Sequence, residues 1–94
     1  GQLRFHYSPG IPVRVNAKYP RENEAFVQFS KKIKNKNNYF SLSKKGNMKE
    51  AAKNLFSTLR MIKKKGYKSI AVGKIPNRGL GIAINDRLKR ASKK

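Results

Sequence analysis

The sequence predicts a small α/β fold, built on an open sheet of about four strands, mostly parallel or mixed, with two main helices. Residues 11–17 alternate apolar and polar side chains, which indicates a half-buried strand. Residues 48–65 repeat apolar side chains at helical spacing. Residues 69–72 form a continuous apolar run, typical of a buried parallel strand. The expected order is strand, strand, strand, helix, strand, helix.

Three short strands are expected before the first helix. In residues 11–17, one side of the strand should carry Ile11, Val13, Val15 and Ala17. Pro12, near the start, indicates an edge strand, since proline donates no ladder hydrogen bond. Residues 25–29 and 39–42 should form the next two strands. Only about seven residues join the first two strands, whereas a parallel crossover between neighbours needs a dozen or more. These strands are therefore either antiparallel or not adjacent.

Each of the two helices has a predicted apolar face. The first face comprises Met48, Ala51, Ala52, Leu55, Phe56, Leu59 and Ile62. Asn47 can cap this helix, with Glu50 three positions later in a capping-box pattern, and Gly66 should end it. The second helix is expected from about residue 80 to residue 92, with one face formed by Leu80, Ile84, Leu88 and Ala91.

Length and composition restrict the kinds of site that the chain can contain. Its 94 residues suffice for one domain, residues 11–94, preceded by an arm or linker over residues 1–10. The sequence has no cysteine, which excludes disulfides and thiolate metal sites, and its single histidine and four acids leave little for a metal centre. No apolar run approaches a membrane span and no signal peptide is evident, so we expect a cytoplasmic protein without membrane association.

Positive charge dominates the composition: 24 Lys and Arg stand against four Asp and Glu, a formal charge of +20. This balance favours polyanionic partners, with nucleic acid first. A lysine-rich solvated surface would produce the same balance without any specific partner. Lys63, Lys64 and Lys65, at the end of the first predicted helix, are candidates for contact with RNA, although a solvated face is the simpler interpretation.

Three stretches occur in the order found in a known family. They are "HYSP" at residues 6–9, "AAKNLFSTLR" at residues 51–60 and "GLGIAINDRLKRA" at residues 79–91. Together they resemble the C-terminal portion of the long form of threonylcarbamoyl-AMP synthase. That family joins a YrdC-like catalytic domain to a small Rossmann-like domain through a linker bearing His-Tyr-x-Pro. Compared with longer members of the family, the chain lacks a helix between the first two strands, which leaves the sheet order open.

The resemblance implies an accessory or regulatory domain, with no catalytic residue and no bound cofactor of its own. The full enzyme makes threonylcarbamoyl-adenylate and pyrophosphate from ATP, bicarbonate and L-threonine, for the threonylcarbamoyladenosine modification of tRNA. ATP and magnesium would belong to the YrdC-like catalytic domain, which these residues do not contain. That domain of the same polypeptide is the implied partner, tRNA is a possible one, and the isolated chain should be monomeric.

The resemblance also implies a role for His6, Tyr7, Ser8 and Pro9, which in the family lie over the active site of the partner domain. A covering segment suits this chemistry, because excluding water protects a hydrolysable acyl-adenylate. Without the resemblance, the same residues would be interpreted as a disordered terminus.

Two further groups of residues are candidate sites. Gly79 and Gly81, before the last helix, could bind a phosphate through backbone amides or could simply form a tight turn. Asn85, Asp86 and Arg87 form a polar cluster, for which a structural role is expected. The two functional classes left open are the accessory domain of an adenylate-forming enzyme and a basic RNA-binding module.

Overall fold

The computed structural model describes residues 10–30 and 37–92. Its elements follow the predicted order, and each end lies within two residues of the expected one. They are β1 (Val13–Ala17), β2 (Ala25–Gln28), β3 (Tyr39–Ser41), α1 (Met48–Lys64), β4 (Ile70–Gly73) and α2 (Leu80–Ser92).

The four strands form one parallel sheet in the order β1-β4-β2-β3. β4 lies between β1 and β2, pairing Ile70 with Val13 on one side and with Ala25 on the other. The first two strands are therefore parallel but not adjacent, which decides between the two arrangements that the short connection allowed. β1 is an edge strand, as Pro12 predicted.

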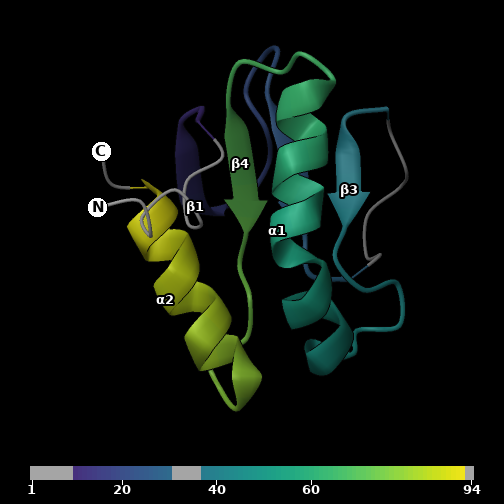
Figure 1. The fold of residues 1–94 in the computed structure, drawn as a ribbon, viewed down its shortest axis with the longest axis vertical. Coiled ribbons are helices and arrows are strands. Elements are labelled where there is room, and N and C mark those ends of the chain that lie inside the picture. Colours follow the sequence, from purple (N-terminus) through teal and green to yellow (C-terminus); the bar gives the residue numbers. More distant parts are fainter. Residues whose placement is uncertain (1–9, 31–36, 93–94) are drawn as a thin grey trace.

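Both helices cover the same face of the sheet (Figure 1). Alternate residues of the strands, such as Val27 and Val72, pack with Leu55 and Leu59 of α1 and Leu88 of α2 in the main core. The intervening residues point to the other face, where Ala17, Phe26 and Ala71 form a second, smaller cluster with Tyr39. The described part of the chain is thus a two-layer structure, and its second sheet face carries no helix.

The prediction for Ala17 was wrong. It was expected on the same side as Val13 and Val15, which do contact the main core, but it lies in the cluster on the opposite face. The register between β1 and β4 shifts between Arg14 and Ala17, and Asn16 has a left-handed φ of 55°. Such a bulge inserts one residue into the strand and reverses the alternation beyond it.

Leu80 also departs from its prediction, because its side chain is 48% exposed. The buried face of α2 instead begins at Gly81 and continues through Ile84, Leu88 and Ala91. Both Leu80 and Gly81 fit the helical spacing to Ile84, so periodicity alone could not choose between them.

The start of α1 uses a third residue in addition to the predicted pair. Asn47 caps the helix, its Oδ1 accepting from the Glu50 amide at 2.8 Å. The Glu50 carboxylate accepts from the Ser43 hydroxyl at 2.5 Å, and the Ser43 Oγ accepts from the Asn47 amide at 2.9 Å. The two halves of the capping box are therefore joined through buried Ser43. Within the described residues, neither helix is long and apolar enough to cross a bilayer.

Candidate functional site

The predicted covering residues, His6, Tyr7, Ser8 and Pro9, lie outside the described residues. The described chain begins at Gly10, which has a left-handed φ of 88°. A Cβ added to Gly10 would lie 2.5 Å from the Lys63 Nζ, so the Lys63 side chain lies against Gly10. Lys64 and Lys65 are exposed beside it at the end of α1. Of the three lysines predicted as RNA contacts, Lys63 is the one that contacts Gly10, and RNA binding by the three stays a prediction.

Gly79 and Gly81 shape the turn that leads into α2. Gly79 has a left-handed φ of 56°, and a Cβ on Gly81 would collide with the carbonyl oxygen of Pro76. The Gly81 amide donates to the Arg78 carbonyl and the Ile82 amide to the Gly79 carbonyl. These contacts account for both glycines structurally, and phosphate binding by their amides stays a prediction.

Asn85, Asp86 and Arg87 point to three different partners. Asn85 Nδ2 donates to the Ile75 carbonyl at 3.0 Å and to Asn77 Oδ1 at 3.3 Å, which ties α2 to the preceding loop. Asp86 pairs with Arg90 one turn along the helix, at 3.1 Å. Arg87 lies over the Phe56 ring, 5.9 Å from its centroid, and so joins α2 to α1. The contacts of Asn85 and Arg87 join α2 to other parts of the chain, whereas the Asp86 ion pair lies within α2.

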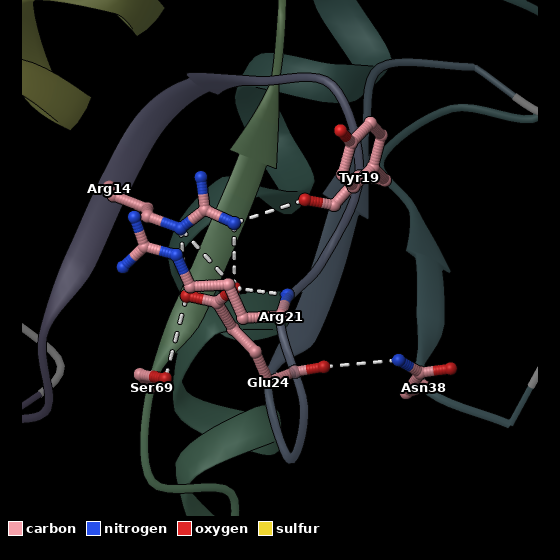
Figure 2. A network of polar contacts seen from close by, with 6 residues as sticks. All are labelled: Arg14, Tyr19, Arg21, Glu24, Asn38 and Ser69. Atoms are coloured by element: carbon pink, nitrogen blue, oxygen red, sulfur yellow. Dashed lines mark hydrogen bonds and ion pairs between the residues drawn. The ribbon is translucent and has the colours of Figure 1, made fainter.

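A polar network that the sequence did not predict surrounds Glu24 (Figure 2). The Glu24 carboxylate is 4% exposed and accepts from Arg14 Nη2 at 2.9 Å and Nε at 3.1 Å. It also accepts from the Arg21 amide at 2.8 Å, and Ser69 Oγ lies 3.5 Å away. Arg14 and Glu24 are ten residues apart on opposite sides of β4, so no local pattern links them.

Electrostatics keep Glu24 ionised. Burial acts to raise the pKa of its carboxyl, but hydrogen bonds from Arg14 and Arg21, together with their positive charges, outweigh burial and lower the pKa below its ordinary value of 4.5. The Arg14 Nη2 also donates to the Tyr19 carbonyl at 3.0 Å, and Asn38 Nδ2 donates to the Glu24 carbonyl at 3.0 Å. The network thus fastens the connection between β1 and β2 to its neighbours. Its carboxylate is committed to structural bonds.

A cavity of about 480 Å³ opens at the carboxyl ends of three strands. Its lining comes from the ends of β1, β2 and β4 and from the loop before α2: Ala17, Lys18, Phe26, Gln28, Phe29, Ser30, Gly73, Lys74, Pro76 and Arg78. Open parallel sheets bind their ligands at this edge. The sequence did not indicate this site, because its residues come from three separate segments, 17–18, 26–30 and 73–78, with no shared motif.

Among residues 10–30 and 37–92, no three His, Cys, Asp or Glu side chains gather into a group that could hold an ion. The described residues therefore offer no carboxylate cluster suited to magnesium.

The family comparison covers almost the whole sequence. The family model for the threonylcarbamoyl-AMP synthase C-terminal domain matches residues 1–93, which include residues 6–9 and the helices and strands of the described structure. No curated protein and no solved structure matches. Since the matched region extends from residue 1 to beyond the end of α2, the chain belongs to the threonylcarbamoyl-AMP synthase C-terminal domain family.

Proposed function

We propose that this chain is an accessory domain of L-threonylcarbamoyladenylate synthase, acting in the biosynthesis of threonylcarbamoyladenosine in tRNA. The observation that carries the proposal is the family match, because it includes residues 1–10 together with the folded domain. In this function, catalysis and the binding of ATP and magnesium belong to a YrdC-like domain of the same polypeptide. The domain described here anchors the linker that covers that active site.

Within the linker, His6, Tyr7, Ser8 and Pro9 supply the cover. A histidine and a tyrosine offer flat apolar faces with polar tips, and proline reduces the entropy lost on closing. Excluding water would protect threonylcarbamoyl-adenylate from hydrolysis before transfer. The contact of Lys63 with the base of the linker at Gly10 supports this role, because it gives the linker a defined point of departure from the domain.

The test uses the full-length synthase carrying Tyr7→Ala or a deletion of residues 6–9. We expect slower adenylate synthesis, or faster loss of the adenylate to water, with the small domain still folded. Tyr19→Ala is the matched control, since Tyr19 is 69% exposed and lies in the connection after β1. Unchanged synthesis and unchanged adenylate lifetime in the linker variants would contradict the covering role.

A second experiment tests whether the domain is inert alone. The 94-residue chain, incubated with ATP, threonine and bicarbonate, should release no pyrophosphate, whereas adding a YrdC-like catalytic domain should restore adenylate formation. Pyrophosphate release by the chain alone would overturn the accessory assignment.

A basic RNA-binding module is the second candidate function, and the observation that favours it is the formal charge of +20. The salt dependence of RNA binding distinguishes specific recognition of RNA from a bulk effect of positive charge.

A further inference from the structure

We propose that the cavity at the carboxyl edge of the sheet binds a mononucleotide, a ligand with a planar ring that bears an amino group and with one phosphate. This inference rests on the cavity alone and is independent of the proposed accessory function. Four features support it: the position of the cavity, its apolar wall, one buried side-chain amide oxygen without a hydrogen-bond donor among the described residues, and the positive charge of the side chains around its opening.

The position of the cavity follows from strand register. Ala17 of β1 pairs with Gly73 of β4, and Val27 pairs with Val72, which brings Gln28 level with the same glycine. These three residues form the last row of the sheet before the loops begin. Gly73 keeps this row open, because a Cβ there would lie 3.1 Å from the Phe26 Cζ and would force that ring to move.

The wall of the cavity suits a flat ring. Phe29 and Pro76, which are partly exposed, contribute apolar surface to it. Phe26 also lines it, although only 2% of this residue is exposed, and its ring is braced by Tyr39 at a centroid distance of 5.0 Å. A volume of about 480 Å³ lies within the range of small-molecule sites, roughly 300–1,000 Å³. Stacking on aromatic side chains is the usual way in which proteins hold a nucleobase.

Gln28 supplies an unused hydrogen-bonding group beside this wall. Its side chain is buried, with 6% of the residue exposed, and its Nε2 donates to Ser41 Oγ at 3.0 Å. The Oε1 accepts from no donor among residues 10–30 and 37–92. A buried acceptor without a partner is costly, and Gln28 belongs to the lining of the cavity. An amino group on the ring of a ligand would satisfy it.

The charged side chains at the cavity all have one sign. Lys18 follows β1, while Lys74 and Arg78 flank the loop between β4 and α2. None of the described lining residues is acidic. Exposed cations with no carboxylate among the described lining residues favour a phosphate over a neutral or cationic group. The ring therefore belongs at the apolar wall, and the phosphate belongs at the rim.

The experiment titrates the 94-residue chain with four probes at about 150 mM salt, where surface charges are screened beyond about 8 Å. The first probe is AMP. Purine riboside 5′-monophosphate lacks the amino group of AMP, adenosine lacks its phosphate, and the fourth probe is inorganic phosphate. We expect AMP to bind tightest and to shift the backbone amide signals of Gly73 and Lys74. Purine riboside 5′-monophosphate cannot form the hydrogen bond to Gln28, so its affinity should be about tenfold lower than that of AMP.

Variants assign the selectivity to single groups. Gln28→Leu should abolish the difference between AMP and purine riboside 5′-monophosphate, whereas a merely structural role would leave their ratio unchanged. The double variant Lys74→Gln/Arg78→Gln should lower the affinity for AMP about tenfold or more, while its affinity for adenosine stays unchanged. The matched control is Lys49→Gln with Lys53→Gln, which removes the same charge from exposed positions on α1.

Three results would overturn the proposal. The first is that the wild-type chain does not bind AMP, and the second is that it binds inorganic phosphate as tightly as AMP. The third such result is that the control pair lowers the affinity for AMP as much as the Lys74 and Arg78 substitutions do. The wild-type preference for AMP over purine riboside 5′-monophosphate tests the amide even if Gln28→Leu fails to fold. None of these readouts depends on synthase activity, so the cavity and the accessory function can fail separately.

Discussion

Glu24 shows at the scale of one residue how a buried charge is stabilised. Its carboxylate is almost fully buried, yet two arginines supply bonds that keep its pKa below the ordinary value. A carboxyl whose pKa is lower in the folded chain binds protons more readily when unfolded. Its contribution to stability is therefore complete above pH 4.5, the ordinary value, and is lost as the pH falls through the folded value.

Glu24→Gln should lower the free energy of unfolding near neutral pH by about 1–3 kcal/mol, because charge-assisted bonds from Arg14 are lost. The difference between wild type and variant should shrink as the pH is lowered below 4.5, since protonation then neutralises the wild-type carboxylate as well. Urea denaturation over a series of pH values measures both effects. Glu22→Gln, at an exposed position two residues earlier, is the control. Equal effects of the two substitutions would contradict the role of Glu24.

At the scale of elements, α1 is held to the sheet by a stripe of apolar side chains. Leu55 and Leu59 are each 1% exposed and contact the main core, as the helical period predicted. Truncating either to alanine should lower the free energy of unfolding by roughly 2–5 kcal/mol, the cost of a cavity in a close-packed core.

Chemical denaturation of Leu55→Ala and Leu59→Ala measures this cost. Met61→Ala on the same helix is the control, because Met61 is 40% exposed and should lose only about 0.5 kcal/mol. Losses below about half a kcal/mol at both leucines would show that the buried face of α1 is wrongly assigned.

At the start of α2, helix propensity and packing predict opposite changes in the free energy of unfolding when Gly81 is replaced by alanine. Propensity alone favours Gly81→Ala by about 1 kcal/mol. The added Cβ would collide with the Pro76 carbonyl oxygen, which is backbone and cannot move aside easily. We therefore expect Gly81→Ala to destabilise the domain.

Thermal or urea unfolding of two variants separates the effects of a steric collision and of backbone strain: Gly81→Ala introduces the collision, and Gly79→Ala introduces the strain. Gly79 has a left-handed φ but no atom within 4 Å of an added Cβ, so its substitution should cost only about 1–2 kcal/mol. Gly81→Ala should cost more than Gly79→Ala. A stabilised Gly81→Ala variant would mean that α2 shifts freely against the preceding loop.

For the whole molecule, the formal charge of +20 predicts how the chain would bind RNA. Charge spread over the surface predicts weak binding without sequence preference, with a log–log salt slope of about −0.7 to −0.9 for each phosphate neutralised. Replacing Lys63, Lys64 and Lys65 with glutamine should then reduce the slope without changing any preference between RNAs. Competition between tRNA and a duplex of equal charge at two salt concentrations measures this. A tRNA preference that persists at the higher salt, and is lost in the triple variant, would favour the RNA-binding function.

Local patterns in the sequence determined the order of the elements, the buried face of α1, the edge position of β1 and the family. Each depends on neighbours within a few residues, such as the spacing of Leu55 and Leu59 or the proline at position 12. The capping of α1 by Asn47 was predictable for the same reason, although the intervening Ser43 was not.

Tertiary structure alone decided the features that bring distant residues together. Placing β4 between β1 and β2 depends on burying both of its faces, which is a property of the whole core. The bulge at Asn16, the pairing of Arg14 with Glu24 and the exposure of Leu80 follow from that packing. The cavity has the same origin, since Ala17, Gln28 and Gly73 become neighbours only when three parallel strands end at one edge.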